Sequence, residues 1–136
     1  MMRVLALDVG DKRIGVAISD PSQVLARSLQ VIQRGSGQEN FAAVTRLVKE
    51  YEVERVVVGY PRSLDGTAGE QADKVERYAA GLAESLTVPV LLWDERFSTV
   101  SAERLMREAG LRGKKKRERV DAVAAAVILQ DYLDSR

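Results

Sequence analysis

The chain has 136 residues and a mass of 15.0 kDa, the size of a single domain that can bury its own core. With 46% apolar and 30% charged residues, it is neither disordered nor fibrous in composition. It contains no cysteine and no histidine, which excludes disulfides, the usual zinc sites and catalysis by Ser-His-Asp or Cys-His groups. Any metal ion must therefore be a hard cation held by oxygen ligands. No apolar run is long enough to cross a bilayer, and we expect a soluble, cytoplasmic protein.

The positive charge is concentrated in one stretch, although the net charge of the chain is only +1. Residues 112–119 contain six basic residues and one acidic residue, so this stretch carries +5 and the rest of the chain −4. Such a run is typical of a solvated loop that faces phosphate groups. We therefore expect residues 112–119 to form a basic loop.

The first part of the chain predicts three strands and a helix. Residues 3–9 are nearly all apolar, as in a strand covered on both faces, and a turn at 10–12 leads into a second strand at 13–19. A third strand is expected at 25–33. Apolar residues then recur every three or four positions from Gln38 to Tyr51, which predicts an amphipathic helix.

The second part alternates strands and helices. The expected order is a strand at 54–59, a loop at 60–67, a helix at 72–86, a strand at 90–94, a helix at 98–109 and a last helix at about 119–133. Gly81 within a helix costs about 1 kcal/mol relative to alanine. The stretch 122–129 is apolar throughout and is expected to be buried all round. Together the elements predict an α/β fold, a mixed five-stranded sheet with helices on both faces, in a single domain over residues 1–136.

Three acidic positions are candidates for chemistry. Alternation places Asp8 on the same strand face as Val4 and Ala6, where an ionised carboxylate needs a partner, although an Asp leading into a turn would also explain it. Asp94 and Glu95 follow an apolar strand, where ligands often bind in α/β sheets. They point to opposite faces, and the register alone does not decide which of them serves a site.

Asp121 is the third acidic position. It is expected in the first turn of the last helix, where the helix dipole alone would favour an acid. Converging carboxylates repel one another, and a divalent cation relieves that repulsion. Paired cations about 4 Å apart can stabilise the attacking and leaving oxygens of a phosphodiester. This arrangement is typical of a metal-dependent nuclease.

Four spaced motifs then carry a resemblance to a known family. They are Leu7–Ala17 with Asp8-Val9-Gly10, Val58-Gly59-Tyr60-Pro61 with Asp65-Gly66-Thr67, Asp94-Glu95-Arg96-Phe97-Ser98-Thr99, and Val120-Asp121-Ala122. In this order, over nearly the whole chain, they resemble the YqgF family, also called RuvX or Holliday junction resolvase-like. The resemblance implies an RNase H-like fold and a nuclease that matures the 5′ end of pre-16S ribosomal RNA in ribosome biogenesis. It places the acidic site at Asp8, Glu95 and Asp121. Since the composition allows only a hard cation with oxygen ligands, we expect these three acids to be catalytic and to hold Mg²⁺ or Mn²⁺ as the cofactor.

Basic residues are the candidates for binding nucleic acid. They are Arg13 and Arg96 within the matching motifs, and Arg112, Lys114, Lys115, Lys116 and Arg117 in the basic stretch. Arg13 and Arg96 could instead pair with a carboxylate of the site. Ser98 and Thr99 are better explained as helix caps than as catalytic groups.

Other functions stay open at this point. A resolvase acting on branched DNA should be a two-fold dimer, but the sequence does not distinguish a monomer from a homodimer. A non-catalytic RNA-binding factor of ribosome assembly is the alternative from another class. A nucleotide-binding ATPase is less suitable, since such enzymes enclose the nucleotide between two domains and the chain has no Gly-x-x-x-x-Gly-Lys-Ser/Thr loop.

Overall fold

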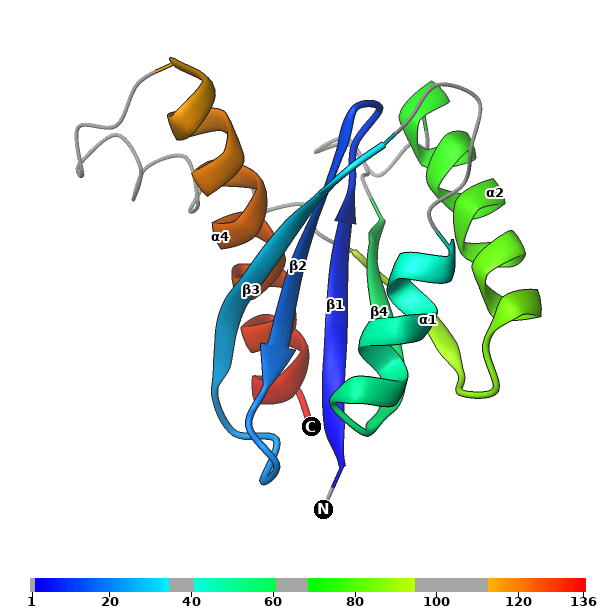
Figure 1. Cartoon of the computed structure of the whole chain (residues 1–136), viewed down its shortest axis with the longest axis vertical. Coiled ribbons are helices and arrows are strands. Elements are labelled where there is room, and N and C mark those ends of the chain that lie inside the picture. Colours follow the sequence, from blue (N-terminus) through cyan, green and yellow to red (C-terminus); the bar gives the residue numbers. More distant parts are fainter. Residues whose placement is uncertain (1, 35–40, 61–68, 95–112) are drawn as a thin grey trace.

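The computed structural model describes residues 2–34, 41–60, 69–94 and 113–136, with the side chains of the last stretch described from residue 123 onward. The elements run in the order shown in Figure 1: β1 (Arg3–Val9), β2 (Arg13–Ser19), β3 (Ala26–Gln33), α1 (Phe41–Glu50), β4 (Val53–Tyr60), α2 (Glu70–Ser85), β5 (Val90–Asp94) and α4 (Gly113–Asp134). All five predicted strands are present, each within one residue of its expected ends. The helix expected at 98–109 and most of the loop expected at 60–67 lie outside the described residues.

The five strands form one mixed sheet in the order β3-β2-β1-β4-β5. β1, β2 and β3 pair as antiparallel neighbours, whereas β4 is parallel to both β1 and β5. The carboxyl ends of β1, β4 and β5 therefore meet at one edge of the sheet, which is the edge where ligands bind in many α/β proteins. The predicted mixed sheet is confirmed.

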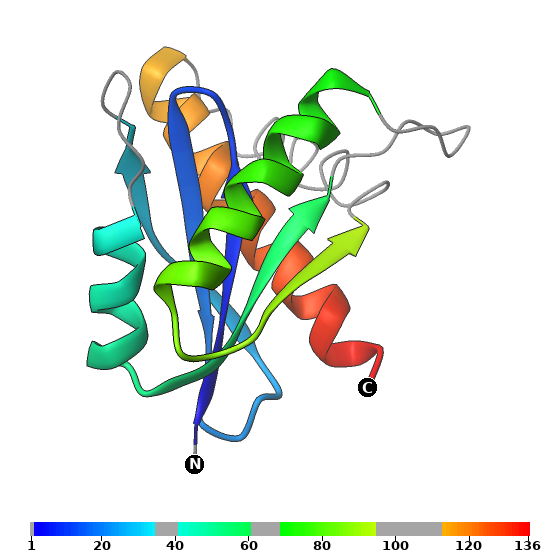
Figure 2. The same cartoon turned by 90° about the vertical axis from the view of Figure 1, so that its right-hand side faces the viewer.

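Helices cover both faces of this sheet, as Figure 2 shows. Leu5 and Leu7 of β1 pack into the larger core with α1 and α2. Val4 and Ala6, on the other face of the same strand, pack into a second core with Ala125 and its neighbours on α4. β1 is thus buried on both sides, which explains its nearly continuous apolar sequence.

α4 differs from the prediction in two ways. It begins at Gly113, so residues 113–119 of the basic stretch are helical and the expectation of a loop there was wrong. Lysine, arginine and glutamate are good helix formers, and nothing between Lys114 and Arg119 interrupts the helix. The helix is also buried on one side only: Ala124 and Ala125 are buried, whereas Val127 is half-buried, because α4 is an outer layer that packs on one sheet.

Two contacts fix the direction in which α4 crosses the sheet. Near its carboxyl end, Arg55 Nη1 at the start of β4 donates a 2.7 Å hydrogen bond to the Tyr132 hydroxyl. The Gln130 side chain accepts from the Ala26 amide at the start of β3. α4 therefore runs opposite to β1, and its amino-terminal half lies toward the carboxyl end of β1 (Figure 1). In the part of the chain that is described, no helix is long and apolar enough to cross a membrane.

Gly81 occupies a position where the fold requires a small residue. A Cβ on Gly81 would lie 2.8 Å from the Phe41 ring, because α1 and α2 pack closely there. The helix cost assigned to Gly81 from the sequence is thus offset by the packing of Phe41 against Tyr78, whose ring centroids are 5.1 Å apart.

Candidate functional site

Asp8 is the best-placed of the predicted acids. It lies one residue before the end of β1, half-buried, on the strand face that Val4 and Ala6 turn toward α4. The neighbouring positions Leu7 and Val9 point to the opposite face, into the core with α1 and α2. The carboxylate therefore lies at the edge of the sheet where β1, β4 and β5 end.

Glycines occupy the neighbouring positions on both adjacent strands. Asp8 pairs with Gly15 of β2, and the pair Leu7–Val58 places Gly59 of β4 opposite Asp8 on the other side. Both glycines share the α4 face with Asp8, because their neighbours Val16 and Val58 point into the core with α1 and α2. The positions directly opposed to Asp8 on both adjacent strands therefore carry no side chain. Gly15 and Gly59 were not among the predicted site residues; the signal for them in the sequence is a glycine within each apolar strand.

The turn after Asp8 brings a basic residue to the same face. Gly10 donates a 2.9 Å hydrogen bond to the Arg13 carbonyl and closes the β1–β2 hairpin. A Cβ on Gly10 would lie 2.9 Å from that carbonyl oxygen, so the glycine of Asp8-x-Gly10 is required by the turn itself. Arg13 is half-buried and, two residues before Gly15, lies on the α4 face with Asp8.

The last residues of β5 show which face of the sheet Asp94 belongs to. Trp93 packs into the core with α4 and makes an edge-to-face contact with Tyr132 at 5.4 Å between ring centroids. Val90 packs into the core with α1 and α2, and alternation places Asp94 on that side, away from Asp8. Trp93 also pairs with Gly59, so it lies in the same cross-strand row as Asp8. Glu95 and Arg96 lie outside the described residues.

The backbone of α4 changes the interpretation of Asp121. Because the helix begins at Gly113, Asp121 lies in the helix interior, more than two turns from the first residue, and the expectation of a first-turn position was wrong. The dipole effect falls off within the first turn and no longer explains an acid there. Asp121 precedes the buried Ala124 and Ala125 by one helical turn, on the half of α4 that lies toward the carboxyl end of β1.

The predicted basic residues lie before Asp121. The backbone of Lys114, Lys115, Lys116 and Arg117 belongs to the first turns of this helix, while Arg112 lies outside the described residues.

The chemistry of the Asp8 position fits a hard divalent cation. The half-buried Asp8 carboxylate supplies oxygen donors, the kind of ligand that a hard divalent cation takes. Among the side chains that the structure describes, no group of three acids forms a complete metal site. Of the three predicted ligands, only Asp8 has a side chain that the structure describes. Glu95 and the side chain of Asp121 lie outside the described residues.

Comparison with known proteins gives matches over the whole chain. The family model described as "RuvX: Holliday junction resolvase" matches residues 2–135. A protein of Thermoanaerobacter pseudethanolicus, named "Putative pre-16S rRNA nuclease", is 46% identical over 136 residues, covering 99% of this chain and 98% of its own length. A protein of Bacillus cytotoxicus with the same name is 47% identical over 137 residues, covering 99% of this chain and 100% of its own length.

Solved structures share the architecture at low sequence identity. RuvC of T. thermophilus in complex with a Holliday junction substrate aligns with a TM-score of 0.59 at 19% identity, over 100% of this chain and 96% of RuvC. Fowlpox virus resolvase in complex with Holliday junction DNA aligns with a TM-score of 0.57 at 14% identity, over 98% of both chains. The predicted RNase H-like fold is thereby confirmed. The fold, the full-length family match and the identities above 40% together establish that this chain belongs to the RuvX family.

Proposed function

We propose that this protein is a metal-dependent nuclease that hydrolyses phosphodiester bonds in the precursor of 16S ribosomal RNA. The observation that carries the proposal is the position of Asp8: a half-buried carboxylate at the carboxyl end of β1, on the α4 face, with glycine at the directly opposed position of both adjacent strands. The substrate is inferred from the names of the relatives, of which two are 46% and 47% identical to this chain.

Glu95 and Asp121 complete the acidic site in this proposal. Trp93, two residues before Glu95, lies on the α4 face in the row of Asp8, which favours Glu95 over Asp94 as the second acid. Asp121 is supported by the direction of α4, whose amino-terminal half lies toward the end of β1. An acid in the helix interior, one turn before buried alanines, has no role in capping the helix.

Asp8, Glu95 and Asp121 would hold Mg²⁺ or Mn²⁺, which when bound lowers the pKa of a coordinated water and stabilises charge on the phosphate oxygens. Asp8 would be a rigidly placed metal ligand, because its backbone is held in the centre of the sheet between β2 and β4. With glycine at both directly opposed positions, no side chain there would hinder the sugar–phosphate backbone of the substrate at the carboxylate.

Basic residues at the same end of the molecule would bind the substrate backbone. Arg13 lies on the α4 face beside Asp8. Lys114, Lys115, Lys116 and Arg117, with Arg112 before them and Arg96 after β5, supply positive charge in the segments that lead into and out of the proposed acids. Contacts to phosphate give affinity without sequence preference, so binding should weaken steeply with salt.

Single substitutions of the three acids test the proposal. Asp8→Asn, Glu95→Gln and Asp121→Asn should each lower the rate of cleavage of a precursor 16S RNA fragment by at least about 100-fold, while RNA binding is retained. Asp73→Asn, which removes an exposed carboxylate on α2, is the matched control and should cleave at the wild-type rate. Cleavage at the wild-type rate by Asp8→Asn would refute the site.

The choice of substrate is tested separately with the wild-type protein. The precursor RNA fragment, a mature 16S fragment and a four-way DNA junction are compared at equal concentration with Mg²⁺ and with Mn²⁺. We expect cleavage of the precursor RNA in preference to the junction. Cleavage of the junction alone would instead identify a DNA resolvase, and binding to RNA without cleavage of any substrate would identify an assembly factor.

A further inference from the structure

A pocket of about 470 Å³ lies on the opposite face of the sheet from Asp8, between the β1–β2 turn and helices α1 and α2. Val9, the residue after Asp8, lines it from β1, and Phe41 and Tyr78 line it from α1 and α2. Its volume falls within the range of about 300 to 1,000 Å³ that is typical of small-molecule sites. Asp8 and Arg13, the described side chains of the proposed nuclease site, are not among the residues that line this pocket.

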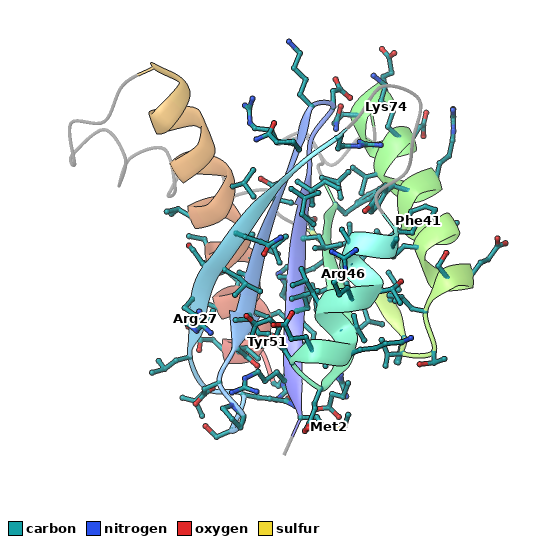
Figure 3. The ribbon with its side chains drawn as sticks, in the orientation of Figure 1. Met2, Arg27, Phe41, Arg46, Tyr51 and Lys74 are labelled. Carbon is teal, nitrogen blue, oxygen red and sulfur yellow. The ribbon has the colours of Figure 1, made fainter. Side chains whose placement is uncertain are left out.

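Basic side chains dominate the charge of its lining. Among the described lining residues, Arg34, Lys74 and Arg77 stand against one acid, Asp11, which gives these residues a formal charge of +2. Lys74 and Arg77 are exposed on the first half of α2, and Figure 3 shows Lys74 near the tip of the β1–β2 hairpin. The ion pair between Lys74 Nζ and Asp11 Oδ1 is 3.5 Å long and exposed to solvent. A surface pair of this kind is weak, so an anionic ligand can displace Asp11 from Lys74.

Arg34 is held more rigidly than the two residues on α2. Its Nη1 donates a 2.8 Å hydrogen bond to the Gly10 carbonyl, and its guanidinium lies 5.3 Å from the centre of the Tyr78 ring. A guanidinium positioned in this way presents a planar set of donors that suits phosphate oxygens. Gln71 is fixed nearby by a hydrogen bond from its Nε2 to the Val9 carbonyl.

The deeper wall of the pocket is apolar. Val9 and Tyr78 are buried, and Phe41 is half-buried with its ring against Tyr78 and Gly81. A phosphate ion alone would leave most of this volume empty and most of this wall in contact with water. A ligand that combines a flat, weakly polar ring system with a phosphate would match both the wall and the charged rim.

We propose that this pocket binds a nucleotide unit, with the base against Phe41 and Val9 and the phosphate on Lys74, Arg77 and Arg34. The unit is either a free mononucleotide or one residue of an RNA strand. The pocket and Asp8 lie on opposite faces of the same strand end, on either side of the β1–β2 turn. A strand bound at both would pass over this turn. Binding here does not depend on the chemistry at Asp8, so it is tested apart from cleavage.

The experiment follows backbone amide signals by NMR in the full-length Asp8→Asn protein, which is not expected to cleave its ligand. AMP, a single-stranded tetranucleotide of RNA and inorganic phosphate are titrated separately. The reporters are the amides of Gln71 and Gly81 at the pocket and of Gly15 on the other face of the sheet. Lys74→Glu with Arg77→Glu reverses two charges at the pocket. Arg46→Glu with Lys49→Glu, two exposed positions on α1 that do not line the pocket, is the matched control.

We expect AMP or the tetranucleotide to shift the Gln71 and Gly81 signals in a saturable way. The pocket double variant should bind at least about tenfold more weakly, whereas the control should match the parent protein. Saturation by AMP identifies a free mononucleotide site, and saturation by the tetranucleotide alone identifies a strand site. The proposal is overturned if neither ligand shifts these signals, if both double variants bind equally, or if inorganic phosphate binds as tightly as AMP. AMP contains no internucleotide phosphodiester bond, so its binding is measured whether or not Asp8 takes part in cleavage. A failure of the nuclease proposal is therefore distinguishable from a failure of this one.

Discussion

Asp8 of β1 and Gly15 of β2 face each other across the antiparallel ladder, on the side of the sheet that α4 covers. Side chains at directly opposed positions have Cβ atoms about 5 Å apart. Glycine at position 15 therefore adds no side chain at the position directly opposite the Asp8 carboxylate. Gly59 does the same from β4, so the strands on both sides of β1 place a glycine next to Asp8.

Gly15→Val should lower cleavage by about tenfold or more, because the new side chain would stand beside Asp8 and displace the substrate from its reacting position. Gly69→Val is the control, since a Cβ on Gly69 has no atom within 4 Å. Cleavage rates and melting temperatures of both variants are compared with those of the parent protein. Full activity in a stably folded Gly15→Val would show that the space beside Asp8 is not used.

Ser19→Ala should destabilise the fold by about 1 to 3 kcal/mol. Ser19 is 1% exposed, and its hydroxyl accepts a 2.8 Å hydrogen bond from the Val4 amide while donating to the Asp20 carbonyl. Alanine would leave the Val4 amide buried without this partner. Urea unfolding measures the free energy of unfolding, with Ser85→Ala, an exposed serine on α2, as the control. Equal stability of the two variants would contradict the role given to Ser19.

Gly81→Ala tests the packing of α2 against α1. Alanine gains about 1 kcal/mol in helix propensity, but its Cβ would lie 2.8 Å from the Phe41 ring. We expect the change in unfolding free energy caused by Gly81→Ala to be more stabilising in the Phe41→Leu background than in the parent protein, by at least about 0.5 kcal/mol. The smaller leucine side chain removes the clash with the new Cβ. A double-mutant cycle of unfolding free energies measures this coupling. A coupling of zero would show that the ring of Phe41 moves away without cost.

Asp20 should make stability depend on acid pH. Its carboxylate accepts hydrogen bonds from Ser22 and from the backbone amides of Leu25 and Val24, and these bonds lower the pKa of Asp20 below its usual value of 3.8. A lowered pKa in the folded state adds stability at pH values above the usual one, and that stability is lost as the pH falls through the lowered value. Asp20→Asn should therefore be less stable than the parent at pH 7, with the difference shrinking toward pH 3. Urea unfolding at several pH values checks this, with Glu84→Gln as the exposed control. A difference that does not change with pH would rule out the carboxylate as its cause.

The sequence by itself determined the strands and their order. An apolar run such as Arg3–Val9, only seven residues long and followed by the turn at Gly10, favours a buried strand over a helix because helices are usually longer. The alternation within that run also assigned Asp8 to the face of Val4 and Ala6, which the structure confirms.

The start of α4 could not be read from the sequence in the same way. A run of lysines and arginines has good helix propensity but also the composition of a solvated loop, and local pattern does not distinguish the two. The helix was therefore expected to begin at Arg119, and the structure starts it at Gly113. As a consequence, Asp121 lies in the helix interior and not in the first turn, where the sequence had placed it.

Only the tertiary structure decided which residues lie beside one another. The register between β1 and its two neighbours placed Gly15 and Gly59 on either side of Asp8, and the parallel pairing of β4 with β5 put Trp93 in the same row. The pocket formed by Arg34, Lys74 and Phe41 combines a strand end with two helices that are far apart in sequence. Local sequence specifies secondary structure through short-range sterics and hydrophobic periodicity, whereas a site depends on strand register and helix packing, which are set by contacts between distant segments.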